Sequence, residues 1–370
     1  MFVGHALLAF ALAGLGARSL GRSRERALLV GAVAGAFAAI PDVDVVYAPV
    51  GALGASGPLE AASGFWAAST LVHRTITHSL VVGVVTAAAL ALWADALRRG
   101  ASGAAVTTGV GDGGRRTATR PSEDWRLRAA AALLTALALV ALAIEGGVLG
   151  GVVTAAFVLA GLAVATAAAR AAFPATTVLA TALLGFVSHP FGDVFTGTPP
   201  AFLYPFDATP LARRVTLSTD PTLQVLGAFG IELVVIWFAA VVHCRLCGRR
   251  LRDHVHGRAA FGLTYAGVAL LIPWPSLDTS YPFVFSVLAV GAIGPAPLVM
   301  RARRFVGATL PLEAPGSRRP SSVGRSGDRR DGRRWRRAAD SDAALTAALT
   351  GLAAITVAAL SYATVYFLSG

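Results

Sequence analysis

Long apolar runs separated by short polar segments restrict the folds open to this chain more than any other feature of its sequence. A helix of about 20 apolar residues crosses a bilayer, and in lipid only helices and closed barrels pair all their backbone polar groups. Charged residues make up only 14% of the chain, whereas soluble domains carry about a quarter. The apolar runs lie near residues 3–17, 27–40, 79–97, 129–145, 148–169, 174–189, 222–242, 259–274, 282–300 and 343–367. We therefore expect an all-α, polytopic integral membrane helical bundle with about ten transmembrane helices.

The arginines indicate how such a bundle is oriented. If ten helices alternate across the membrane, 29 of the 32 basic residues fall on one side. Basic residues concentrate in cytoplasmic loops, so we expect a multi-pass protein of the plasma membrane with these loops in the cytoplasm. Residues 41–78 and 190–221 then lie on the extracytoplasmic side, together with both termini. Because the net charge of +12 follows this pattern, we expect contact with membrane lipids and no nucleic-acid partner.

Histidines and aspartates that are far apart in the sequence fall at the predicted outer ends of helices. They are His5, Asp42 and Asp44 in "PDVD", His73 and His78 in "HRTITHS", and His189 and Asp193 in "SHPFGDVFTG". Imidazole and carboxylate groups held at one depth by rigid elements are suitable metal ligands. Polar clusters within a membrane protein are usually functional. The sequence therefore predicts a metal site at the outer face of the bundle.

The spacing within two of these motifs predicts how their side chains point. In "PDVD" the proline ends the preceding helix, and an extended backbone directs both carboxylates to the same side. In "HPFGD", Pro190 suits the first position of a new helical turn. His189 and Asp193 are four residues apart and on that turn face one site.

The "HRTITHS" motif offers two histidines but only one expected ligand. His73 and His78 are five residues apart, and on a continuous helix they lie on different faces. We expect His78 to be the ligand and His73 to lie beside it. Thr77 or Ser79 is expected to cap the helix that follows.

In this order, "GHALLAF", "PDVD", "HRTITHSL" and "SHPFGDVFT" resemble the YdjM-like family of LexA-regulated inner-membrane proteins, which are metal-dependent hydrolases. That family is distantly similar to zinc-dependent phospholipase C and P1-type nuclease. The resemblance implies a divalent metal cofactor, zinc, as one or two ions. The ligands that it implies are His5, Asp42 or Asp44, His78, His189 and Asp193.

The resemblance covers roughly residues 1–215, and the apolar runs and composition of the chain complete the expected domain organisation. Residues 1–215 form a membrane-embedded, metal-dependent hydrolase-like domain with a disordered insert at 98–124. Residues 216–300 add further transmembrane helices, 301–340 form a basic disordered cytoplasmic linker, and 341–370 form a C-terminal transmembrane helix. The insert and the linker lack the apolar content that offsets the entropy lost on ordering.

The function implied is hydrolysis of a phosphoester or lipid-linked substrate at the extracytoplasmic membrane interface, where a metal ion lowers the pKa of water to about 7. A carboxylate of Asp42 or Asp44 that is not a ligand is the expected general base, with His73 as the third catalytic candidate. Arginines bind anionic groups through paired hydrogen bonds. The substrate-binding candidates are the arginines that break the charge pattern: Arg74, Arg213 and Arg214.

Two alternative functions stay open at this point. A membrane transporter places ionisable groups near the middle of its spans, and Glu232 in "GAFGIELVVIW" is such a group. A non-catalytic membrane protein stabilised by a metal is the other alternative, and it differs from an enzyme in having no open coordination position.

Overall fold

All regular structure in the described part of the chain is helical, which agrees with the all-α prediction. The computed structural model describes residues 3–69, 74–106, 125–145, 147–206, 208–296 and 328–369. The chain divides into two compact units, Met1–Cys247 and Gly248–Gly370.

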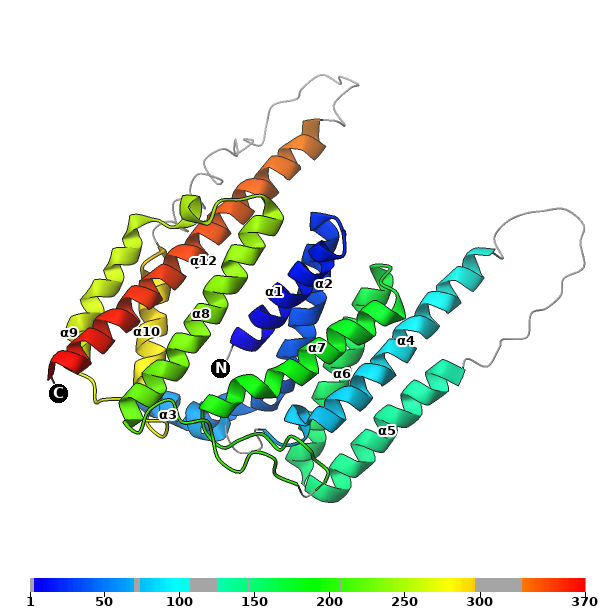
Figure 1. Cartoon of the computed structure of the whole chain (residues 1–370), viewed down its shortest axis with the longest axis horizontal. Helices are drawn as coiled ribbons and strands as arrows, with labels where there is room; N and C mark the ends of the chain where they lie inside the picture. The colour runs from blue at the N-terminus through cyan, green and yellow to red at the C-terminus, as the bar shows by residue number, and fades with distance from the viewer. Residues whose placement is uncertain are drawn as a thin grey trace, which may run out of the picture. The chain divides into compact units, whose positions relative to one another are not determined.

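The first unit is a helical bundle linked by short 3-10 helices, and it carries all the predicted site residues (Figure 1). Its long helices are α1 (Gly4–Ser19), α2 (Arg24–Ala39), α3 (Pro58–Ser69), α4 (Leu80–Val106), α5 (Trp125–Glu145), α6 (Val148–Arg170), α7 (Ala175–Gly192) and α8 (Pro221–Cys247). The 3-10 helices are η1 (Pro41–Val45), η2 (Ala48–Ala52), η3 (Ile76–His78) and η4 (Asp193–Phe195). In this unit α2 packs against α1 and α7, and α4 packs on the other side of α7.

The second unit contains shorter pieces packed on one long helix. Its elements are η5 (Leu251–His254), η6 (Gly257–Thr264), α9 (Tyr265–Ala269), α10 (Tyr281–Ile293) and α12 (Asp328–Ser369). An aromatic cluster forms part of its core, in which the rings of Tyr265, Phe283 and Tyr362 contact one another.

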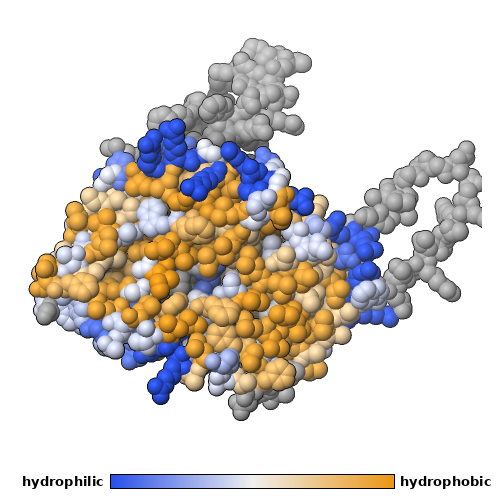
Figure 2. All heavy atoms as spheres, in the orientation of Figure 1, coloured by the Kyte–Doolittle hydropathy of each residue, from blue (hydrophilic) through white to orange (hydrophobic). Residues whose placement is uncertain are grey.

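Five of the described helices are long and apolar enough to cross a membrane, and counting the bent pair of α2 with η1 and η2 gives six. The described residues therefore show a membrane protein with several candidate spans, and the total of about ten stays a prediction. Helix α1 has 16 residues and is about 24 Å long, which is shorter than the hydrocarbon core of about 30 Å. Residues 259–274, expected as one span, instead form most of η6 and the short helix α9. Figure 2 shows apolar residues over much of the visible surface, as expected for helices that face lipid.

Glycines allow the helices around the predicted site to approach closely. A Cβ atom on Gly35 of α2 would lie 2.8 Å from the carbonyl oxygen of Ala6 in α1. A Cβ atom on Gly185 of α7 would lie 2.7 Å from the backbone nitrogen of Ala38 in α2. Small residues at helix crossings bring backbones into contact in membrane proteins. The start of α1, the end of α2 and the second half of α7 are thus held together.

The structure differs from the predicted domain organisation in three places. Helix α8 packs against α1, so the first unit extends to Cys247 and not to residue 215. Residues 98–106, expected in the disordered insert, continue α4, while 107–124 lie outside the described residues. Residues 328–340, expected in the disordered linker, begin α12. Their sequence contains six arginines, which favour helix, and it leads directly into the apolar helix that follows. Residues 301–327 lie outside the described residues.

Candidate metal centre

Five of the predicted site residues converge inside the first unit. His5 comes from the first turn of α1, Asp42 from η1, His78 from η3, His189 from the last turn of α7 and Asp193 from η4. The side chains of His78 and His189 are fully buried, and those of His5 and Asp193 are nearly so. Asp42 is the most accessible of the five, with 22% of its side chain exposed.

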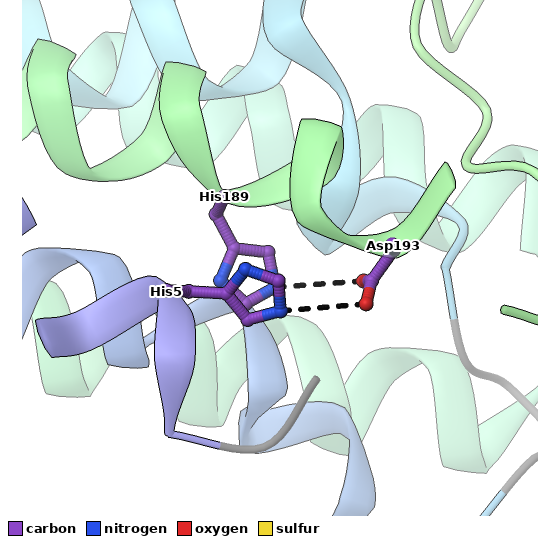
Figure 3. Close-up of side chains that lie close together, drawn as sticks. All are labelled: His5, His189 and Asp193. Carbon is purple, nitrogen blue, oxygen red and sulfur yellow. Dashed lines mark ion pairs between the residues drawn. The ribbon is translucent and has the colours of Figure 1, made fainter. Parts of the chain in front are cut away.

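The imidazole nitrogens and carboxylate oxygens of this cluster lie within a few ångströms of one another. The Nε2 atoms of His78 and His189 are 3.1 Å apart. Asp193 Oδ2 lies 3.1 Å from the first of these nitrogens and 3.8 Å from the second. Asp42 Oδ1 lies 3.4 Å from His189 Nε2, and His5 Nε2 lies 3.3 Å from Asp193 Oδ1. Figure 3 shows the His5 ring next to that of His189, with the Asp193 carboxylate beside both, and the two ring planes are tilted by 40°.

The opposite nitrogen of each central histidine already has an acceptor. His189 Nδ1 lies 2.7 Å from the carbonyl oxygen of Ala38, so this nitrogen must carry the proton and donate. His78 Nδ1 lies 2.9 Å from Thr77 Oγ1, which in turn donates to Asp44 Oδ2 at 3.0 Å. These two hydrogen bonds assign the His78 proton to Nδ1. Each Nε2 atom therefore directs a lone pair into the cluster, which is the form in which histidine binds metals.

Burial also favours the neutral form of the His78 imidazole. Loss of solvent lowers the pKa of its imidazole below the ordinary value, because a charged ring is disfavoured away from water. His78 is thus neutral at pH 7 and available as a ligand.

Two overlapping groups of side chains in the described residues can hold a metal ion. One consists of His5, His189 and Asp193, and the other of Asp42, His78 and His189. In each group the ligand atoms lie within 4.8 Å of one another. His189 Nε2 belongs to both groups, although its lone pair can bind only one ion.

Asp44 lies behind His78 and not among the converging atoms. Its Oδ2 atom accepts from Thr77 Oγ1 and from the backbone nitrogen of Arg74, and it lies 3.4 Å from His78 Nδ1. The expected extended "PDVD" is wrong, because Pro41 starts the 3-10 helix η1. In this tighter backbone Asp42 faces His189 while Asp44 faces the other side of His78.

The backbone of the "HPFGD" motif also differs from the expectation, although its side chains point as predicted. Pro190 lies inside α7 and does not begin a new turn. His189 and Asp193 are nevertheless on one face, as predicted from their spacing. Ser79 caps α4, since its Oγ atom accepts from the backbone nitrogen of Val82 at 3.3 Å.

Arg74 holds the loop that carries Asp193. Its guanidinium group donates to the carbonyl oxygens of Thr196 and Thr198 and to Thr196 Oγ1, and its Nη2 atom lies 3.4 Å from Asp193 Oδ1. Its backbone has a positive φ of 70°, which is uncommon for a residue with a side chain and often marks a functional site. The anion contact expected of Arg74 stays a prediction.

Arg213 and Arg214 are not among the converging side chains of the described residues. Arg213 and Arg214 are exposed, and His73 lies outside the described residues. The backbone nitrogen of Val215 donates to the carbonyl oxygen of Val194 at 2.7 Å, which places the segment after the two arginines beside η4. Gln224 strengthens this attachment, because its side chain bonds the carbonyl oxygen of Phe195 at 2.8 Å.

Sequence reasoning missed the supporting contacts of Thr77 and Gln224. The position of Thr77 directly before His78 was a usable signal, since a hydroxyl next to a metal-binding histidine can orient its ring. Gln224 gave no such signal, because its role depends on the path of the loop before α8.

Residues 1–144 match the family model of the YdjM inner membrane protein, which confirms the resemblance over this part of the chain. The match includes His5, Asp42 and His78, whereas His189 and Asp193 lie beyond it. Searches of curated proteins and of solved structures gave no match.

Proposed function

We propose that the cluster binds one or two divalent metal ions, zinc being the best fit, and that the protein is a metal-dependent hydrolase. The observation that carries this proposal is the approach of two imidazole lone pairs to 3.1 Å. Lone pairs at this distance repel one another, and the carboxylates of Asp42 and Asp193 add negative charge. A cation among these atoms removes the repulsion, and histidine with carboxylate is a common ligand set for zinc.

The side chains divide into those that hold the ion and those that fix their direction. His78, His189 and Asp42 hold one ion, and His5 with Asp193 can complete it or hold a second. When bound, the ion supplies Lewis acidity and lowers the pKa of water to about 7. Asp44 acts through Thr77 on the His78 ring, as carboxylates commonly do behind metal-binding histidines.

Where His5, His189 and Asp193 hold the ion, Asp42 is not a ligand and is the group best placed to move a proton. With 22% of its side chain exposed, it is the most accessible member of the cluster. A carboxylate at the edge of the site can accept a proton from water, as a general base requires. His73 stays a proposed catalytic residue on its sequence position next to Arg74.

The proposed substrate is a phosphoester, either free or linked to a lipid, at the extracytoplasmic membrane interface. The positive-inside pattern of the arginines supports this side of the membrane. Arg213 and Arg214 support an anionic substrate, because they are exposed and precede a segment held against η4. Exposed guanidinium groups bind phosphate through paired hydrogen bonds.

A non-catalytic metal site is the second candidate, and one observation favours it. The complete burial of His78 and His189 resembles a structural zinc site, in which protein ligands occupy every position. The exposure of Asp42 favours an open site and therefore an enzyme.

Two measurements on the purified full-length protein test this proposal. Metal content is measured by mass spectrometry, and hydrolysis is measured on a panel of phosphodiesters and phospholipids, for wild type and for His78→Ala. We expect at least one metal ion per chain, lost in the variant together with hydrolysis. Metal binding without any hydrolysis supports the structural alternative, and a wild-type protein without metal contradicts both.

A further inference from the structure

Glu232 is a buried carboxylate in the middle of an apolar helix. It lies eleven residues after the start of α8, or about 16 Å along the helix axis. Only 9% of the residue is exposed. A carboxylate at this depth is costly and is usually retained for a function. Glu232 has no part in the proposed hydrolysis.

The contact made by Glu232 connects it to the candidate metal centre. Its Oε1 atom accepts a hydrogen bond of 3.2 Å from the backbone nitrogen of Val3. Val3 directly precedes α1, and its apolar side chain makes no capping hydrogen bond. The first N–H groups of a helix lack partners within the helix, and a negative charge near them is stabilising. Glu232 therefore supplies from α8 the acceptor that the start of α1 lacks.

The position of this helix start determines where His5 lies. His5 is two residues after Val3, and its ring is confined between His189, at 4.0 Å between ring centroids, and Gly192. Its Nε2 atom lies 3.3 Å from Asp193 Oδ1. A small movement of the first turn of α1 would displace the imidazole from this narrow space.

We propose that Glu232 is a positioning residue for the metal centre, and that it places His5 by anchoring the start of α1. This inference rests on the proposed metal binding for its functional meaning, while the anchoring itself does not require a metal. It also gives α8, which lies beyond residues 1–144, a part in the function of the N-terminal helices.

The anchoring is tested on the metal-free, full-length protein by modifying histidines with diethyl pyrocarbonate and locating the products by mass spectrometry. Three variants are compared with wild type: Glu232→Gln, Glu232→Leu and Val234→Ala. Glutamine keeps the acceptor oxygen, whereas leucine removes it and still suits a membrane helix. Val234 is 68% exposed on the same helix and serves as the matched control. The exposed His256 reports that the reagent is active.

We expect His5 to be protected in wild type, Glu232→Gln and Val234→Ala, and to react in Glu232→Leu, while His189 stays protected throughout. Equal protection of His5 in all four proteins overturns the inference. Reaction of both His5 and His189 in the leucine variant also overturns it, because the bundle has then opened generally.

A separate metal titration distinguishes this inference from the proposed function. Outer partners of metal ligands are typically worth about 10–100-fold in affinity, so Glu232→Leu is expected to weaken binding by at least about tenfold. Glu232→Gln loses only the charge at the helix start and is expected to stay within about fivefold of wild type. If wild type binds no metal while His5 reactivity still depends on position 232, the proposed function fails and the anchoring stands. If wild type binds metal and Glu232→Leu binds it equally well, the positioning role fails and the metal site stands.

Discussion

The Nε2 atoms of His78 and His189 lie 3.1 Å apart, although the Nδ1 atom of each ring already faces a hydrogen-bond acceptor. The Ala38 carbonyl oxygen accepts from His189 Nδ1, and the Thr77 hydroxyl accepts from His78 Nδ1. Both lone pairs therefore point to one position, which a shared proton or a metal ion must occupy. Metal binding is the stronger explanation, because carboxylates from separate elements converge on the same position.

Substituting His189 by alanine is expected to reduce metal affinity by more than about 100-fold. This residue belongs to both candidate ligand groups, and direct ligands matter at least as much as the outer partners worth about 10–100-fold. Titration with Co²⁺, followed by its absorption spectrum, measures the change. His243→Ala is the control, since His243 lies on α8 and contacts Cys247. Equal binding by wild type and His189→Ala would show that His189 is not a metal ligand.

Thr77 is expected to act on metal binding through the His78 ring. Thr77→Val keeps the shape of the side chain but removes the hydroxyl that links His78 Nδ1 to Asp44. We expect a loss of about 10–100-fold in metal affinity, as for other outer partners of ligands. Thr77→Ser restores the hydroxyl and is expected to bind like wild type. Normal metal binding by the valine variant would show that the His78 ring keeps its orientation without these hydrogen bonds.

Metal binding is expected to weaken as the solution becomes acidic. Burial lowers the pKa of His78 below its ordinary value of about 6.5. The imidazole is therefore neutral at pH 7 and takes up a proton only at lower pH, where protons compete with the metal. Titrations at pH 8, 7, 6 and 5 test this order. Affinity that falls between pH 7 and 5 agrees with a neutral His78 ligand, whereas affinity that rises on acidification contradicts it.

The sequence predicted correctly which motifs come together. It predicted the backbone conformation of those motifs less well. Helix ends at one depth suffice to bring His5, His78 and His189 together, because each lies at the end of a separate apolar run. The course of "PDVD" depends on a 3-10 turn after Pro41, and local propensity does not separate that turn from an extended segment.

Two further features depend on tertiary packing that the sequence does not reveal. Hydropathy measures the apolar content of a run but not the length of the helix within it, so residues 259–274 resembled a span although α9 has five residues. The contact between Glu232 and Val3 joins residues 229 positions apart. It follows from the packing of α8 on α1, for which the sequence contains no periodic signal.

Gly192→Ala is expected to disturb the site by displacing His5. A Cβ atom at position 192 would lie 2.3 Å from Cε1 of the His5 ring, which is too close for two carbon atoms. Overpacking of this kind typically costs about 1–3 kcal/mol, so we expect a lower thermal midpoint and weaker metal binding. Gly230→Ala is the matched control, because a Cβ atom there has no neighbour within 4 Å. If Gly192→Ala matches this control in both measurements, His5 does not occupy the described position.

Arg74→Lys is expected to loosen Asp193 and thereby weaken metal binding. The guanidinium group of Arg74 bonds several oxygens of the loop that follows Asp193 while lying 3.4 Å from the carboxylate itself. Lysine keeps the charge but lacks the planar fork that makes these contacts together. We expect about a tenfold loss of metal affinity and a lower thermal midpoint, with exposed Arg170→Lys as the stability control.

The same variant decides between the two roles considered for Arg74. If it holds Asp193, metal affinity falls and any loss of hydrolysis is recovered at saturating metal. If it binds an anionic substrate, metal affinity is unchanged and KM for a phosphodiester rises, because binding energy to the phosphate is lost. The contacts of the guanidinium group with Asp193 and Thr196 favour the first result. Unchanged metal affinity combined with a higher KM would instead assign Arg74 to the substrate.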